Sequence, residues 1–524
     1  MAVNRLLKQL GISVVAAFLS WQALAPFIAD CYLQQAQSAY NKQEVDLSLQ
    51  KVKRSLSWAS HSLEAIFLLG RIYQKMGVYS SSVEAYEKAL GFFPYAAIVW
   101  NNLGTARFLT GDAEGAVQSL QKVVSLDPAN IGAHYNLALV YEAKNERRLV
   151  EVQLEKIREL DPNFMGNVYL SKGVYDDSAA EYHRAIRRNP DNLEAHYKLG
   201  FIYEKKNSLD QAIEMYQKVL SINPEYVDAR RRLAFLYHQF PRKQYDEAIS
   251  QYRRCLELLP DEIDKVYERV SFYTDMNIYT QVLEEHVRIS ELKDMRTEII
   301  KELAALYELR GERENAVDEY KKLLEDFPKD VQLYQRIAAL YENQGKFKEA
   351  IAEYKEIVKY DPQDTEVKDK LRKIEEAQAH VALAAVYEKG GLRQRSVDEY
   401  KKASAALPEN PYLYYILGWL HVQEANKPDA VGFYQKAVLL DAGFYQARVA
   451  LARVFQDLDD FGHAEEQYRI ILNAFPDYIQ AHLGLGLLFE RQNRYEEAKK
   501  EYQEVLRLDP ANSEARILLD NLPK

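Results

Sequence analysis

Apolar residues recur at steps of three and four along most of the chain, and they do so in paired blocks. In residues 331–362 the first block places its apolar residues at Tyr334, Ile337, Ala338 and Tyr341, and the second at Ala350, Tyr354 and Ile357. This spacing puts each set on one face of a helix. Gly345 separates the blocks, and Pro362 ends the second because proline lacks the amide hydrogen that a continuing helix needs. The pattern predicts a pair of packed helices.

These helix pairs recur with a nearly constant period. Prolines stand at positions 94, 128, 162, 190, 224, 260, 328, 362, 408, 476 and 510. Five of the ten gaps are 34 residues, and two gaps of 68 residues are double periods with Asp294 and Ala442 in the skipped positions. A pair of short helices cannot bury its apolar face alone, so neighbouring pairs must stack. The sequence therefore predicts one all-α solenoid, although 524 residues would suffice for several globular domains.

The order of residues within each period resembles the tetratricopeptide repeat. The agreement is best at Trp100-Leu103-Gly104-Ala116-Pro128, at His196-Leu199-Gly200-Tyr203-Ala212-Tyr216-Pro224 and at His482-Leu485-Gly486-Phe489-Ala498-Tyr502-Pro510. The resemblance covers about residues 63–522. It implies a right-handed superhelix of antiparallel helix pairs whose first helices line a concave groove, and it implies protein or peptide ligands.

The period also divides the chain into segments. We expect an n-region at 1–9, a hydrophobic helix at 10–29, a degenerate first repeat at 30–62, about twelve to thirteen repeats over 63–510, and a capping helix at 511–524. The unit at 163–190 lacks the opening turn and a half of its first helix. An insertion at 363–374 predicts one long helix over about 365–389 that projects beyond its neighbours, either toward another chain or as solvated surface.

Residues 10–29 carry no charge and are long enough to span a bilayer. Arg5 and Lys8 precede this segment and Asp30 follows it, so the positive-inside rule places the array on the extracytoplasmic side, periplasmic or at the cell surface. Cleavage after Ala25, which would give a secreted protein, or lipidation at Cys31 is the alternative, and a merely buried helix is a third. An anchor followed by an array resembles bacterial proteins that organise envelope or surface-polymer assembly.

Composition narrows the classes of function. Half of the 38 tyrosines fall in two recurring helix slots and are interpreted as packing residues. A net charge of −10 argues against a general nucleic-acid footprint, and the arginines at 230–232 and 253–254 lack an accompanying pattern of stacking aromatics. Two cysteines exclude a disulfide scaffold. We therefore expect no nucleic-acid partner.

The sequence offers no catalytic, cofactor or metal motif. It contains no HExxH, GxSxG, phosphate-binding loop or CxxC pair. Several histidines stand in helix slots that hold core residues elsewhere, and they are interpreted as structural: His134, His196, His286, His380, His421 and His482. We predict a protein that is not an enzyme.

Candidate binding residues lie on the expected groove face of the first helices. Tyr412, Tyr415 and Trp419 share one stripe of residues 411–421, and equivalent positions nearby hold Val381, Val449, Leu483 and Leu487. Exposed aromatics in an apolar concavity are typical of binding hot spots, although packing within a tight superhelix would explain them too. Asn102 and Asn136 occupy equivalent slots in successive repeats and could grip a peptide backbone.

The resulting hypothesis is a membrane-tethered scaffold that binds protein or peptide partners in its groove. The alternative is a structural subunit that assembles with copies of itself into a homopolymeric filament.

Overall fold

The computed structural model describes residues 24–239, 244–276 and 278–523. The predicted n-region at 1–9 and most of the hydrophobic helix predicted at 10–29 lie outside these residues. Residues 24–41 are helical, and the side chains of Leu24 and Phe27 are exposed there. Within the described ranges, no helix combines the length and the apolar character needed to cross a membrane.

Every regular element of the described residues is an α-helix, and the contacts divide the chain into two compact units, 1–206 and 207–524. After the helical residues 24–41, the first unit contains α2 (Val45–Trp58), α3 (Leu63–Lys75), α4 (Tyr79–Phe92), α5 (Ala97–Leu109), α6 (Ala113–Leu126), α7 (Ile131–Ala143), α8 (Arg147–Leu160), α9 (Phe164–Ser171), α10 (Tyr175–Arg188) and α11 (Leu193–Lys205).

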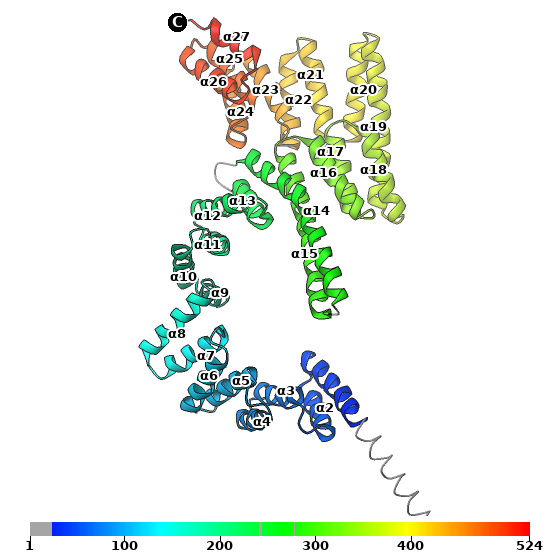
Figure 1. Cartoon of the computed structure of the whole chain (residues 1–524). Helices are drawn as coiled ribbons and strands as arrows, with labels where there is room; N and C mark the ends of the chain where they lie inside the picture. Colours follow the sequence, from blue (N-terminus) through cyan, green and yellow to red (C-terminus); the bar gives the residue numbers. More distant parts are fainter. Residues whose placement is uncertain (1–23, 240–243, 277, 524) are drawn as a thin grey trace, which may run out of the picture. The chain divides into compact units, whose positions relative to one another are not determined.

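The second unit contains helices α12 to α27 (Figure 1). They are α12 (Leu209–Ile222), α13 (Val227–Gln239), α14 (Tyr245–Asp275), α15 (Tyr279–Leu309), α16 (Arg313–Asp326), α17 (Val331–Asn343), α18 (Phe347–Tyr360), α19 (Thr365–Lys389), α20 (Arg393–Ala406), α21 (Pro411–Gln423), α22 (Lys427–Leu440), α23 (Tyr445–Asp457), α24 (Phe461–Ala474), α25 (Ile479–Arg491), α26 (Tyr495–Leu508) and α27 (Ser513–Asn521). The chain is thus an all-α solenoid of stacked helix pairs.

A tyrosine in the second helix of a repeat packs on a glycine in the first. A β-carbon on Gly486 would lie 2.3 Å from Cε1 of Tyr502, and one on Gly70 would lie 2.4 Å from Cε1 of Tyr86. In this slot, whether the first helix supplies glycine or alanine, the tyrosine hydroxyl donates to a side chain twelve residues earlier: Tyr86 to Gln74 (3.3 Å), Tyr320 to Glu308 (2.8 Å), Tyr354 to Glu342 (2.7 Å) and Tyr502 to Glu490 (2.8 Å). These rings are buried, as a packing role requires.

A second recurring interaction ties several first helices to the end of the preceding repeat. A side chain near the start of the helix bonds to the carbonyl oxygen of the proline six residues earlier. The pairs are Trp100 with Pro94 (2.9 Å), His134 with Pro128 (3.1 Å), His196 with Pro190 (2.9 Å), Tyr334 with Pro328 (3.3 Å), Tyr414 with Pro408 (3.2 Å) and His482 with Pro476 (2.7 Å). The slot that the sequence pattern presents as large and apolar therefore also requires a hydrogen-bond donor.

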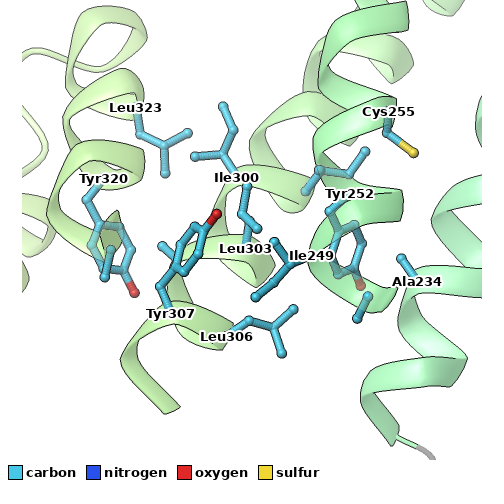
Figure 2. Packing of buried hydrophobic residues seen from close by; sticks show 14 of the residues in the cluster. Ala234, Ile249, Tyr252, Cys255, Ile300, Leu303, Leu306, Tyr307, Tyr320 and Leu323 are labelled. Atoms are coloured by element: carbon cyan, nitrogen blue, oxygen red, sulfur yellow. The ribbon is translucent and has the colours of Figure 1, made fainter. Parts of the chain in front are cut away.

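The repeats between 245 and 309 differ from the predicted pattern, because two pairs of successive helices are fused. α14 continues through Pro260, and α15 continues through Asp294. A proline inside a helix costs about 3 kcal/mol. Here an uninterrupted apolar face on both sides of Pro260, with Leu259 and Val266 fully buried, offsets that cost. Figure 2 shows part of the core that α13, α14, α15 and α16 share.

The long helix expected near 365–389 is α19, which runs beside α20 (Figure 1). Its first turns do not project freely: Val367 is 5% exposed and Ile374 is fully buried in a core shared with α18 and α20. Lys370 also pairs with Glu342 of α17 at 3.0 Å. The insertion is part of the packed solenoid, so the expected projection is wrong.

The shortened unit at 163–190 begins with α9, which has 8 residues, whereas an ordinary first helix such as α7 has 13. A polar network joins this unit to the next repeat. Asn163, only 9% exposed, donates to Glu194 at 2.8 Å and exchanges hydrogen bonds with Asn192. Asn167 donates to the other oxygen of Glu194 at 3.0 Å. These hydrogen bonds stabilise the stacking of this unit on the next repeat, where the turns missing from α9 would otherwise contribute contacts.

Candidate functional site

Two of the predicted groove aromatics, Tyr412 and Tyr415 of α21, lie together in the second unit. Their ring centroids are 6.4 Å apart, and the ring of Tyr415 is 5.1 Å from that of Phe444, which precedes α23. The three rings line a cavity of about 610 Å³, called the aromatic cavity below. Burial raises the pKa of Tyr412, whose hydroxyl is neutral at physiological pH and can donate a hydrogen bond.

The opposite wall of the aromatic cavity is polar and comes from two helix–helix turns. The α15–α16 turn and the start of α16 supply Gly311, Glu312, Arg313, Glu314 and Asn315, and the α17–α18 turn supplies Asn343, Gln344 and Lys346. Gln446 at the start of α23 completes the lining. Gln344 Nε2 is buried and has no hydrogen-bond partner in the described part of the chain. A carboxamide of this kind can bind a backbone carbonyl oxygen.

The two walls meet because later repeats pack back onto earlier ones. Asn410 Nδ2 donates to the carbonyl oxygen of Glu342 at 3.0 Å, although 68 residues separate them. Arg313 forms an ion pair with Asp441, and its guanidinium lies 4.9 Å from the centroid of the Phe444 ring. Arg313 is 9% exposed, so these contacts fix a buried cation at the edge of the cavity.

A second ionic contact lies beside the aromatic cavity. Arg310 pairs with Asp246 at the start of α14 and lies 3.8 Å from Asp477 before α25. Partial burial opposes ionisation of Asp246, but a hydrogen bond from Asp477 and the charge of Arg310 lower its pKa. Burial and the same hydrogen bond raise the pKa of Asp477. Arg310 thus contacts two carboxyl groups, those of Asp246 and Asp477, that come from distant repeats.

The other predicted groove residues lie elsewhere. Trp419 is 39% exposed, and it is not among the residues that line the aromatic cavity. Val449 and Leu483 are buried in the core of α22 to α26, while Val381 and Leu487 are half-buried. Packing therefore buries Val449 and Leu483, and the α17–α18 turn lies against Tyr412. Of the predicted groove residues, Tyr412 and Tyr415 line the aromatic cavity.

Asn102 and Asn136, the two predicted backbone-binding amides, lie in the first unit. Asn102 Nδ2 donates to the carbonyl oxygen of Ile98 in its own helix at 2.8 Å. Asn136 Nδ2 donates to Asn101 Oδ1 at 3.2 Å. Both amide nitrogens are thus engaged within the chain, and a backbone ligand would have to displace these bonds.

The arginines of the basic cluster are engaged with their own neighbours. Arg230 donates to Gln251 at 2.7 Å, Arg231 lies 3.7 Å from Glu298, and Arg254 pairs with Glu257 at 2.6 Å. Within the described ranges, no group of three or more His, Cys, Asp or Glu residues is placed to hold a metal ion.

Sequence reasoning missed the polar wall of the aromatic cavity. Glu312, Asn315 and Gln344 lie in or next to short helix–helix turns whose sequence resembles the other turns of the array. They line a cavity because Tyr412, Tyr415 and Phe444 of later repeats lie opposite them. One signal was present: Gly345 and Gly311 mark tight turns, and both have positive φ, at 72°. The sequence does not reveal that a distant helix lies against them.

Stacked helix pairs define a helical repeat protein of the solenoid class. Models described as tetratricopeptide repeat match residues 63–94, 193–226, 309–374 and 449–513, and a model described as TPR repeat matches 104–145 and 166–207. The chain is a solenoid of tetratricopeptide repeats.

Similarity to individual proteins is limited. The TPR repeat-containing protein MJ1428 of Methanocaldococcus jannaschii is 26% identical over 153 residues, which are 28% of this chain and 27% of the relative. The peroxisomal targeting signal receptor of Candida albicans is 25% identical over 127 residues, 23% of this chain and 22% of the relative. The chain thus spans about a quarter of these curated relatives. Yeast Tom70 aligns with 94% of this chain and 94% of its own at 15% identity, with a TM-score of 0.30.

Proposed function

We propose that the chain is a non-enzymatic scaffold that binds an extended peptide segment of a partner protein in the aromatic cavity. The observation that carries the proposal is the pairing of three aromatic rings with a facing polar wall. The rings are Tyr412, Tyr415 and Phe444, and the wall combines the carboxamides of Asn315, Asn343, Gln344 and Gln446 with the charged side chains of Glu312, Arg313, Glu314 and Lys346. Aromatic rings bury the apolar side chains of a ligand at low entropic cost, and carboxamides can both donate to and accept from its backbone. A peptide needs both kinds of contact.

The proposal is tested by selecting peptides from a displayed library on the full-length protein and comparing variants. Gln446→Ala removes an exposed polar wall residue, and Tyr415→Leu removes one ring while retaining apolar volume. Each should weaken the selected peptides at least tenfold while helicity is retained. Tyr95→Ala, which removes a 77% exposed tyrosine in the first unit, is the matched control and should bind normally. Equal binding by all three variants would exclude the aromatic cavity.

The proposal includes a membrane tether at residues 10–29, with the array on the extracytoplasmic side and a role in cell-envelope or surface-polymer assembly. The uncharged sequence of this segment supports it, together with the exposure of Leu24 and Phe27 at 54% and 67%. Alkaline extraction of membranes should leave the full chain in the pellet, and protease added outside should digest the array. A mature N-terminus at residue 26 or 31 would instead favour cleavage or lipidation.

A homopolymeric subunit is the second candidate, favoured by a different feature. The end of the α14–α15 hairpin exposes Phe272 on α14, Met276 just after it, and Leu283 and Val287 on α15, each at 58% or more. Charged residues of both signs flank them, including the Arg269–Glu285 pair, so two copies could meet there without uniform repulsion. Light scattering across concentrations should show growth that Leu283→Lys and Val287→Lys abolish. A monomer at every concentration would exclude assembly.

A further inference from the structure

A recurring hydrogen bond joins the second helix of one repeat to a tyrosine near the end of the next first helix. The two residues are twenty positions apart. The pairs are Gln121 with Tyr141 (3.3 Å), His183 with Tyr203 (3.0 Å), Gln217 with Tyr237 (3.0 Å) and Lys321 with Tyr341 (2.8 Å). In each pair a side-chain nitrogen meets the phenol oxygen, which can accept a hydrogen bond.

This pairing is replaced at one repeat by two basic residues. His421 of α21 occupies the tyrosine slot, and Lys401 of α20 stands twenty positions before it. An imidazole is shorter than a phenol, and it offers a lysine ammonium no comparable hydroxyl. Both residues line a cavity of about 530 Å³ between α20, α21 and α22, called the lysine cavity below.

His421 is 7% exposed, and only one of its two ring nitrogens has a hydrogen-bond partner in the described part of the chain. Its Nδ1 lies 3.4 Å from Asn426 Nδ2, and the ring stacks on Phe433 with centroids 5.1 Å apart. Its Nε2 is buried and has no hydrogen-bond partner in the part of the chain that the structure describes. If Nδ1 accepts from the Asn426 amide, Nε2 carries the proton. A buried donor left unpaired is unfavourable, so a ligand that supplies an acceptor removes this cost.

The remaining lining favours a single negative charge next to an apolar group. Lys436 adds a second ammonium group, 5.6 Å from the ring of Tyr414, and Pro428 and Phe433 provide apolar surface. Asp429 also lines the cavity, and the Glu424 carboxylate lies 4.0 Å from His421 Nδ1. These two carboxylates would repel a dianionic phosphate more strongly than a carboxylate. The planar fork of arginine, which suits phosphate best, does not occur among the lining residues.

We propose that the lysine cavity binds a carboxylate of an acidic peptide segment, with His421 Nε2 as the buried donor and Lys401 and Lys436 as the cationic rim. The inference rests on the proposed function, because it takes the ligand to be part of a protein partner. It adds a second site, distinct from the aromatic cavity, and a chemical class for the group that enters it.

The test measures fluorescence anisotropy of a labelled peptide, phenylalanine followed by six glutamates, with the full-length protein. The glutamine version of this peptide and a phosphoserine version are the comparison probes. The double variant Lys401→Gln/His421→Tyr rebuilds the pair seen at Gln217 and Tyr237, so it should fold normally and bind the glutamate peptide at least tenfold more weakly. Lys321→Gln is the matched control, because it removes a lysine from the same slot where Tyr341 is retained.

The inference is overturned if the double variant binds the glutamate peptide as tightly as the unmodified chain, or if the glutamine peptide binds equally well. If the phosphoserine peptide binds more tightly than the glutamate peptide, the lysine cavity recognises a phosphoryl group and the proposed carboxylate ligand is wrong. If library peptides bind the aromatic cavity but the glutamate peptide does not bind, the lysine cavity is not a carboxylate site and the proposed function stands. If neither the library peptides nor the glutamate peptide binds, the proposed function is wrong as well.

Discussion

The ring of Tyr412 lies directly against Gly345, a turn residue 67 positions earlier in the chain. A β-carbon on Gly345 would fall 2.2 Å from Tyr412 Cε1, and the residue also has a positive φ of 72°. Two separate requirements, backbone conformation and space, therefore demand glycine at this turn. The contact lies beside the aromatic cavity, which Tyr412 and the neighbouring Gln344 and Lys346 line, and it holds later repeats against earlier ones.

Replacing Gly345 with alanine should lower the stability of the second unit by more than the cost of the backbone strain at this residue. Alanine with positive φ costs about 1–2 kcal/mol, and the clash with Tyr412 adds to this. Gly391→Ala is the matched control, because Gly391 has a φ of 71° and a β-carbon added there would meet nothing within 4 Å. Urea unfolding followed by circular dichroism should give the lower midpoint for Gly345→Ala. Equal midpoints would show that Tyr412 moves away without cost.

The local architecture could be predicted from the sequence because its causes are local. The 34-residue period, the glycine at positions such as 486 and the tyrosine at 502 each express contacts within one repeat or between neighbours. The two fused helices could not be predicted, since Pro260 stops a helix unless tertiary packing offsets the lost hydrogen bond, and that packing depends on α15. Likewise, the stripe containing Tyr412 and Tyr415 is recognisable in the sequence, but its polar wall is not.

The histidines also show which roles can be predicted from the sequence and which cannot. The sequence pattern predicts structural roles for His134, His196 and His482, and each bonds to a proline carbonyl. The same pattern predicts a structural role for His421, yet its Nε2 is buried without a partner in the described part of the chain. The difference lies in the slot: His421 replaces a tyrosine near the end of its helix, where the recurring partner is a side chain of the preceding repeat.

Gly486→Ala should destabilise the C-terminal repeats, although alanine normally favours a helix. A β-carbon there would lie 2.3 Å from Cε1 of Tyr502, a fully buried ring that cannot swing into solvent. Overpacking of this kind costs about 1–3 kcal/mol. Gly432→Ala in α22 is the control: it meets nothing within 4 Å and should gain about 0.5–1 kcal/mol. Hydrogen exchange of α25 and α26 should be faster for Gly486→Ala and unchanged or slower for the control.

The stability of the repeat containing His482 should fall as pH rises above neutrality. Burial alone would lower the pKa of His482, but hydrogen bonds to the Glu501 carboxylate (2.6 Å) and the Pro476 carbonyl (2.7 Å) outweigh it and raise the pKa above its ordinary value of 6.5. The folded state therefore binds this proton more tightly than the unfolded chain. The stabilisation is complete below pH 6.5 and is lost as pH rises through the raised pKa. Hydrogen exchange of residues 476–505 at several pH values measures it, and Glu501→Gln should flatten the dependence.

Arg310→Gln should weaken the packing of later repeats on earlier ones, because it leaves Asp246 and Asp477 facing each other without their cation. A fully buried pair loses about 3–5 kcal/mol on such a change, but Asp246 is 62% exposed, so we expect about 1–2 kcal/mol. Adding Asp477→Asn should restore most of the loss at pH 7, since it removes the carboxyl group whose pKa is raised. Acidification should likewise narrow the difference between Arg310→Gln and the unmodified chain. Thermal unfolding with both variants measures these effects, and an unchanged Tm for Arg310→Gln would show that this ionic contact does not hold the repeats together.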